Sequence, residues 1–234
     1  MRVALFIPCF VDQFFPNVAI AMVAVLKRLK VDVYYPSEQT CCGQPGFNAG
    51  YWDEARLLAK RHCEIFAEAD AIVSPSGSCT AMVRNFYREL LGGDNVPACV
   101  NRSYEFSEFL VKVLKVEDVG ARFPHRVTYH DSCHLLRELG VSEAPRLLLR
   151  NVRDVELVEM NDYKLCCGFG GTFSVKFPEV SVPMGQDKIR AAQDTGADFL
   201  VAADGGCLMH LNGIIHRQSL PLKTMHLAEL LAQK

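Results

Sequence analysis

Short apolar runs alternate with longer amphipathic stretches along this chain. Six runs rich in β-branched residues have the length of buried strands, at residues 3–6, 31–35, 71–73, 126–129, 155–158 and 199–202. Apolar positions between them recur with helical spacing, most clearly at residues 18–29 and 55–69. Strands that alternate with helices predict an α/β fold with mainly parallel sheets and right-handed crossovers.

The cysteines show that the chain is an internal duplication. Cys9, Cys41, Cys42 and Cys79 recur, 124 to 128 residues later, as Cys133, Cys166, Cys167 and Cys207. The two halves therefore predict two pseudo-symmetric small α/β domains, residues 1–121 and 122–234, joined through the Gly-containing, Pro-containing and charged segment 116–126.

The repeated cysteines stand where predicted strands end. "VALFIPC", "RVTYHDSC", "DAIVSPSGSC" and "DFLVAADGGC" are each a short apolar run, then a turn, then a cysteine. Ligands of parallel sheets collect beyond the carboxyl ends of the strands. We therefore expect all eight cysteines at that edge, with Gly43 and Gly168 allowing a tight turn after each cysteine pair.

Composition and charge exclude several classes of protein. The chain has 234 residues, 50% of them hydrophobic, and a formal net charge of -2 without a broad basic field, so it predicts a globular protein that does not bind nucleic acid. The longest apolar helical run, residues 18–26, is too short for a membrane anchor. The N-terminus reads as a strand rather than a secretion signal. These features predict a cytoplasmic protein.

Ten cysteines in a reducing compartment favour metal or redox chemistry over structural disulfides. Four thiolates per half fit one 4Fe-4S cluster per domain. Zinc is the alternative, but structural zinc sites usually have shorter cysteine spacings. A thiol-disulfide relay is weaker still, because the chain has no C-x-x-C. Cys63 and Cys99 have no repeat counterpart, and we expect both to be buried as small apolar side chains.

The two "CCG" motifs, "HDSCH" around Cys133, and the "SGSC" and "GGC" ends resemble a known family. They are similar to the cysteine-rich (CCG) domain found twice in one of the subunits of heterodisulfide reductase and in the iron-sulfur subunit of glycolate oxidase, and most closely to the lactate-utilization protein A family. The likeness covers almost the whole chain. It implies an electron-carrying subunit of a three-protein system that oxidises L-lactate to pyruvate, with partner subunits that include a ferredoxin-type iron-sulfur protein.

The chain departs from the heterodisulfide reductase pattern at two positions. That pattern ends in C-x-x-C, whose extra cysteine helps to hold a noncubane cluster, whereas this chain has Ser76 and Asp204 there. An ordinary four-cysteine cluster, or one with an oxygen ligand from Asp204, fits better. The chain also contains no C-x2-C-x2-C-x3-C-P run, so another polypeptide would supply the ferredoxin module.

Three functions remain open from the residues. The first is the redox subunit, and the second is a zinc-binding or assembly module that supports a partner redox enzyme. The third is a self-contained enzyme acting on a 2-hydroxy acid, which ranks last because the sequence has no G-x-G-x-x-G loop for a flavin or nicotinamide. His130 or His134 could serve as a base, but contact with the cluster surroundings is the favoured role, and no catalytic residue is assigned. His62 and His210 are expected in the core or beside the cluster.

Overall fold

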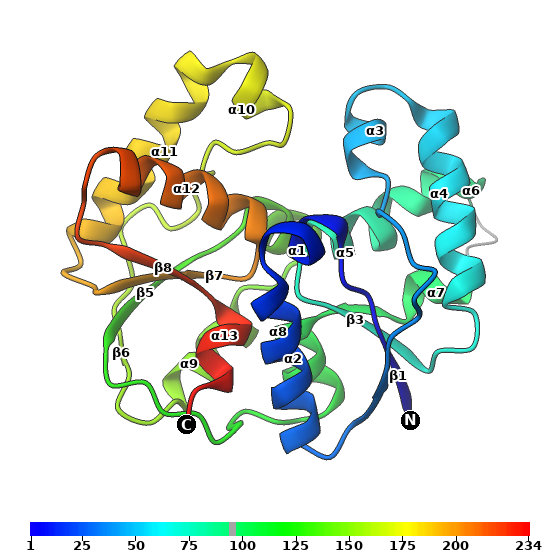
Figure 1. Ribbon diagram of the computed structural model, residues 1–234, viewed down its shortest axis with the longest axis horizontal. Coiled ribbons are helices and arrows are strands. Elements are labelled where there is room, and N and C mark those ends of the chain that lie inside the picture. Colours follow the sequence, from blue (N-terminus) through cyan, green and yellow to red (C-terminus); the bar gives the residue numbers. More distant parts are fainter. Residues whose placement is uncertain (94–96) are drawn as a thin grey trace.

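The computed structural model describes residues 1–93 and 97–234. Its framework is two four-stranded sheets in which every strand pair is parallel (Figure 1). The first sheet has the order β2-β1-β3-β4 and the second the order β6-β5-β7-β8. Their strands are β1 (Arg2–Leu5), β2 (Asp32–Tyr34), β3 (Ala71–Ser74), β4 (Ser103–Glu105), β5 (Arg126–His130), β6 (Glu156–Leu157), β7 (Phe199–Ala202) and β8 (Lys223–His226).

The two sheets repeat one another in register. Val3 lies opposite Ala71 in the first sheet, and Val127 lies opposite Phe199 in the second. Central strands β3 and β7 are buried along their whole length, as expected for strands covered by helices on both faces. The predicted α/β class and the duplication are both confirmed. We call the first sheet with its helices lobe one and the second sheet with its helices lobe two.

Helices join successive strands and cover both sheets (Figure 1). Pro16 and Pro178 each occupy the first helical turn, where the missing N–H is not needed. The helices are α1 (Cys9–Phe14), α2 (Pro16–Arg28), α3 (Gln44–Asn48), α4 (Trp52–Ile65), α5 (Gly77–Ala81), α6 (Tyr87–Leu91), α7 (Ala98–Asn101), α8 (Phe106–Glu108), α9 (Glu143–Arg150), α10 (Phe173–Lys176), α11 (Pro178–Gln193), α12 (Gly205–Arg217) and α13 (Leu227–Ala232), with π-helical turns η1 (Met82–Phe86), η2 (Phe109–Val113) and η3 (His134–Glu138).

One hydrophobic cluster is shared by both lobes, and each lobe also has a smaller cluster of its own. The buried side chains of the shared cluster come from both halves of the chain, from Val3 to Leu231. The C-terminal helix α13 packs on α2, and Arg28 of α2 donates hydrogen bonds to the carbonyl oxygens of Leu231 (3.1 Å) and Ala232 (2.7 Å). This packing holds the two sheets in a fixed relation. The division at residue 122 stays a prediction.

Two cysteines differ from their expected state. Cys63 of α4 and Cys99 of α7 form a disulfide, with their Cα atoms 5.4 Å apart. The prediction of two separate buried thiols was therefore wrong. It failed because each cysteine was judged alone, whereas packing of α4 against α7 brings the two to bridging distance.

No helix within residues 1–93 and 97–234 combines the length and apolar character that crossing a membrane requires.

Candidate metal centre

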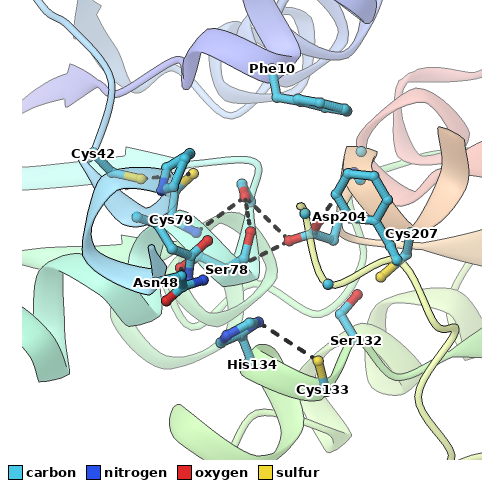
Figure 2. A pocket seen from close by; sticks show the side chains of 18 of the residues that line it. Phe10, Cys42, Asn48, Ser78, Cys79, Ser132, Cys133, His134, Asp204 and Cys207 are labelled. Carbon is cyan, nitrogen blue, oxygen red and sulfur yellow. Dashed lines mark hydrogen bonds between the residues drawn. The ribbon is translucent and has the colours of Figure 1, made fainter. Parts of the chain in front are cut away.

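All eight repeated cysteines line a single cavity of about 190 Å³ where the two lobes meet. Cys9, Cys79, Cys133 and Cys207 follow the carboxyl ends of the central strands, and the adjacent pairs lie in the loops that lead to α3 and α10. Figure 2 shows Cys42 and Cys79 on one side of the cavity and Cys133 and Cys207 on the other. The structure thus brings together the residues that the duplication singled out, at the predicted sheet edge.

In lobe one the four thiols, which we call quartet one, interact as a set. The Sγ atoms of Cys42 and Cys79 are 3.5 Å apart. Hydrogen bonds from Cys42 and Cys9 hold the pKa of Cys41 well below its usual range, so Cys41 is the thiolate of the set. The same contacts raise the pKa of Cys9 and of buried Cys42, each of which keeps its proton while donating to Cys41.

Quartet two, in lobe two, reproduces this arrangement. Hydrogen bonds from Cys133 and Cys167 lower the pKa of Cys166 strongly, and the pKa of Cys133 and Cys167 rises in turn. Cys167 and Cys207 are both buried. In each quartet the contacts therefore favour deprotonation of the first cysteine of the adjacent pair, Cys41 or Cys166, and a metal binds cysteine as the thiolate.

A glycine turn follows each cysteine pair. Gly43 (φ 85°) and Gly168 (φ 90°) adopt the left-handed region that side chains disfavour. Their backbone N–H groups donate to the Sγ atoms of Cys41 and Cys166, each at 3.4 Å. The turn therefore positions the thiolate of each quartet and stabilises its negative charge.

A carboxylate lies between the two quartets. Asp204 caps α12 through the N–H of Gly206 (3.1 Å), and its other oxygen accepts from the N–H of Ser78 (3.0 Å) and the hydroxyl of Ser76 (3.3 Å) in lobe one (Figure 2). Both oxygens have hydrogen-bond partners, so Asp204 bridges the lobes. An oxygen ligand from Asp204 to a cluster stays a prediction, and it would require one of these hydrogen bonds to be given up or shared.

Aromatic rings border the cavity from both lobes. Phe10 of α1 packs edge-on against Phe169, with ring centroids 5.7 Å apart. Phe47 stacks on Trp52, with a centroid distance of 5.3 Å, beside the pair of quartet one. Phe10 and Phe169 line the cavity and limit the access of water to it. Phe173 lies outside this lining and contacts Phe177.

The histidines differ in their surroundings. The Nδ1 atom of His134 lies 3.7 Å from the Sγ of Cys133, and His134 lines the cavity. His130 is fully buried, and a ring nitrogen lies within 4.8 Å of the Sγ atoms of Cys167 and Cys207. His62 packs among Phe rings in the core, as expected, and His210 lies 3.2 Å from the carbonyl oxygen of Ser181.

Two buried cations of lobe two were not foreseen. Arg146 forms a two-pronged ion pair with Asp131, at 3.0 and 2.6 Å, and contacts Glu159 at 2.7 Å. Lys188 is 1% exposed and donates to the carbonyl oxygen of Asp162 at 2.9 Å. The "HDSCH" motif placed Asp131 beside the site, but no local pattern pointed to an arginine 15 residues later.

The donor set fits an iron-sulfur cluster in each lobe. Each quartet supplies four thiols and a backbone N–H that donates to a sulfur atom; three thiols of quartet one and all four of quartet two are at least partly shielded from solvent. Four thiolates are the usual ligands of a 4Fe-4S cluster, and N–H groups near sulfur are the usual means of tuning it. Cys9, Cys41, Cys42 and Cys79 would hold one cluster and Cys133, Cys166, Cys167 and Cys207 the other.

The fold and the thiol-lined cavity define a protein of two cysteine-rich domains. The family model described as "Cysteine-rich domain" (CCG) matches residues 3–84 and 127–212, which include all eight cysteines of the quartets. The chain belongs to the lactate utilization protein A family. It is 46% identical over 235 residues to a protein of that name from Geobacillus sp. (99% of both chains), and 47% identical over 237 residues to one from Exiguobacterium sp. (98% of this chain, 96% of the other).

A solved structure shares the fold. A hypothetical protein from Helicobacter pylori matches with a TM-score of 0.68 at 10% sequence identity, over 98% of this chain and 48% of that chain. At that identity the likeness concerns the fold alone. The family resemblance expected from the "CCG" motifs is confirmed by the curated relatives and the domain matches.

Proposed function

We propose that this chain is an iron-sulfur electron-transfer subunit of a system that oxidises L-lactate to pyruvate. The observation that carries the proposal is that two quartets of thiols open onto one cavity at the junction of the lobes. When bound, an iron-sulfur cluster accepts and releases one electron at a time. The protein would supply eight thiolates, the glycine N–H groups and the apolar rim around them.

The lining of the cavity favours electron transfer over direct chemistry on lactate. A 2-hydroxy acid is an anion, and a site for it needs a cationic or strongly donating partner for its carboxylate. Among the described residues that line the cavity none is Arg or Lys, and Asp204 adds a negative charge. A partner subunit would therefore bind the substrate. The relatives are named "Lactate utilization protein A", and the proposal assigns a role in lactate utilization to this chain as well.

Partners and location follow from the same proposal. The chain would assemble with other lactate-utilization subunits, including a ferredoxin-type iron-sulfur protein, in the cytoplasm. Affinity purification of the tagged chain from cells growing on lactate tests this assembly. Co-purification of a protein with ferredoxin-type cysteine motifs is expected, and recovery of the chain alone at native expression levels would argue against it.

Zinc is a second candidate because of one particular group. A ring nitrogen of His130 and the Sγ atoms of Cys167 and Cys207 lie within 4.8 Å of one another and would supply three of the four ligands of a tetrahedral zinc ion. Among residues 1–93 and 97–234 this kind of group is found in lobe two, and Phe6 occupies the matching position of lobe one. Zinc binding would therefore be confined to one lobe, whereas the iron-sulfur proposal uses both.

Anaerobic reconstitution separates the two candidates. The full chain is incubated with iron and sulfide, desalted, and assayed for iron, sulfide and zinc, with visible absorption and EPR spectra before and after dithionite. The proposal predicts about eight iron atoms per chain and an EPR signal on reduction. One tightly bound zinc ion without visible absorption would contradict it.

A further inference from the structure

The helices that back the two quartets present matching buried positions to them. In α4 the buried residues include Ala55, Ala59 and His62, and in α11 they include Ser181, Gly185 and Lys188. Each pair is 126 residues apart, as the duplication requires, and both helices pass beside the glycine of the CCG turn. His62 and Lys188 are therefore equivalent residues.

The strands give a second equivalent pair. Phe6 follows β1, and His130 ends β5 at the same register position. Phe6 contacts His62, with ring centroids 4.7 Å apart. In lobe two the charge of Lys188 acts on His130. Quartet one is thus backed by the phenyl ring of Phe6 and the imidazole of His62. The equivalent groups behind quartet two are the imidazole of His130 and the amine of Lys188.

These pairs differ in charge and in hydrogen-bonding capacity. Burial lowers the pKa of His62 to about 3, so lobe one has a neutral pair. His130 is fully buried and makes no ion pair within the described part of the chain, and such a ring is neutral and carries one N–H. Neither ring nitrogen of His130 has a hydrogen-bond partner among the described residues, and one faces Cys167 and Cys207.

Lys188 supplies a positive charge that lobe one lacks. Its ammonium group donates to the carbonyl oxygens of Asp162 (2.9 Å) and Tyr163 (3.2 Å), in the segment that leads to the cysteine pair. Burial lowers its pKa, whereas the nearby carboxylates of Asp131 and Asp162 oppose that shift. A bound anionic cluster would favour the charged amine further.

Two carboxylates near quartet two, those of Asp131 and Asp204, already have ionic or hydrogen-bond partners. Asp131 is held in a two-pronged ion pair with Arg146, and the partly exposed Glu159 shares the same guanidinium group. The carboxylate of Asp204, whose equivalent in lobe one is Ser76, acts on Cys133 of quartet two, and it accepts hydrogen bonds from donors of both lobes. The deepest thiols are equally shielded, since Cys42 and Cys167 are each 2% exposed.

On these grounds we infer that the two lobes are electronically unequal, and that a cluster held by quartet two takes up an electron at a higher potential than one held by quartet one. The buried ammonium of Lys188 and the free N–H of His130 stabilise the added negative charge, and Phe6 and His62 offer neither. In a chain reduced by one electron, that electron would then reside mainly on the cluster held by quartet two. This inference rests on the proposed function.

Potentiometric titration of the reconstituted full chain, followed by EPR, tests the inference. The Cys41→Ser variant, in which only quartet two keeps four thiols, assigns the signals to their lobes. In the wild type we expect two midpoints, the higher from lobe two. Lys188→Met should lower that midpoint by at least about 59 mV, which corresponds to a tenfold change in a one-electron equilibrium. The midpoint of lobe one should not move.

His62→Met is the matched control, because it changes the equivalent position of lobe one without removing a charge. It should leave the higher midpoint unchanged. His130→Phe installs the residue of lobe one and should lower the higher midpoint in the same direction, which keeps the test decisive if Lys188→Met does not fold.

Two coincident midpoints in a chain that holds both clusters would overturn this inference and leave the proposed function standing. An unchanged higher midpoint in Lys188→Met, or in His130→Phe where Lys188→Met does not fold, would have the same consequence. A chain that binds no iron at all would overturn both.

Discussion

The CCG turns allow a matched test of how the backbone holds each quartet. Gly43 and Gly168 share the same role and nearly the same φ, 85° and 90°. Alanine at either position must adopt a left-handed conformation, which costs about 1 to 2 kcal/mol. The lower entropy of the unfolded chain offsets about 0.4 to 1 kcal/mol of that cost.

The surroundings of the two glycines differ. A Cβ at residue 43 would make ordinary contacts at 3.5 Å with Ala55 and Leu58. A Cβ at residue 168 would overlap the carbonyl oxygen of Ser181 and lie 2.9 Å from the Cβ of Met184. The second substitution forces the loop away from α11, and such overpacking costs about 1 to 3 kcal/mol more.

Gly43→Ala should therefore lower the free energy of unfolding by about 1 kcal/mol and Gly168→Ala by about 3 kcal/mol. Urea unfolding followed by circular dichroism measures both values under identical conditions. After reconstitution, Gly168→Ala should also lose iron from quartet two, since its N–H would no longer reach Cys166. Equal destabilisation of the two variants, within about 0.5 kcal/mol, would refute the steric reasoning.

Three further predictions concern buried groups. Burial raises the pKa of Glu105 from 4.5 to about 7, so the folded chain binds more protons than the unfolded chain between those values, and stability should fall by about 3 kcal/mol as pH rises through that window. Glu105→Gln should abolish this decline in urea unfolding at pH 5 and pH 8, and an unchanged difference would count against the burial argument. Asp131→Asn leaves Arg146 with one charged partner, and we expect a loss of about 3 kcal/mol in chemical denaturation, whereas a loss below about 1 kcal/mol would mean that the pair contributes little. In Gly77→Ala the added Cβ would lie 2.7 Å from the Cβ of Leu135 across the lobe junction, so the melting temperature should drop by several degrees, and an unchanged value would show that α5 can shift freely.

Much of the site could be predicted because strand exits and cysteine spacing are local signals. "DAIVSPSGSC" and "DFLVAADGGC" each contain a buried strand, a cap residue and a cysteine, so the sheet edge that they share follows from the pattern. Because the pattern occurs in both halves of the chain, each expected cysteine position is supported twice. Cys41 and Cys166 were placed correctly, at the same edge, for this reason.

Features that depend on packing between distant segments could not be predicted. The partners of Asp204 are supplied by Ser76 and Ser78, and only the approach of the two lobes brings them together. Cys63 and Cys99 have no repeat counterpart, so nothing in the spacing paired them. Lys188 stands in a helical stretch with no distinguishing motif around it, and only the packing of α11 places it at the buried position equivalent to His62.

The measurement that tests the central claim most directly is the iron and sulfide content of Cys41→Ser and Cys166→Ser after anaerobic reconstitution. Each substitution removes the thiolate of one quartet and leaves the other quartet intact. The account predicts that each variant keeps about half of the wild-type iron and sulfide, and that the double variant keeps almost none. Near-complete retention of iron in both single variants would contradict the assignment of these thiols as ligands.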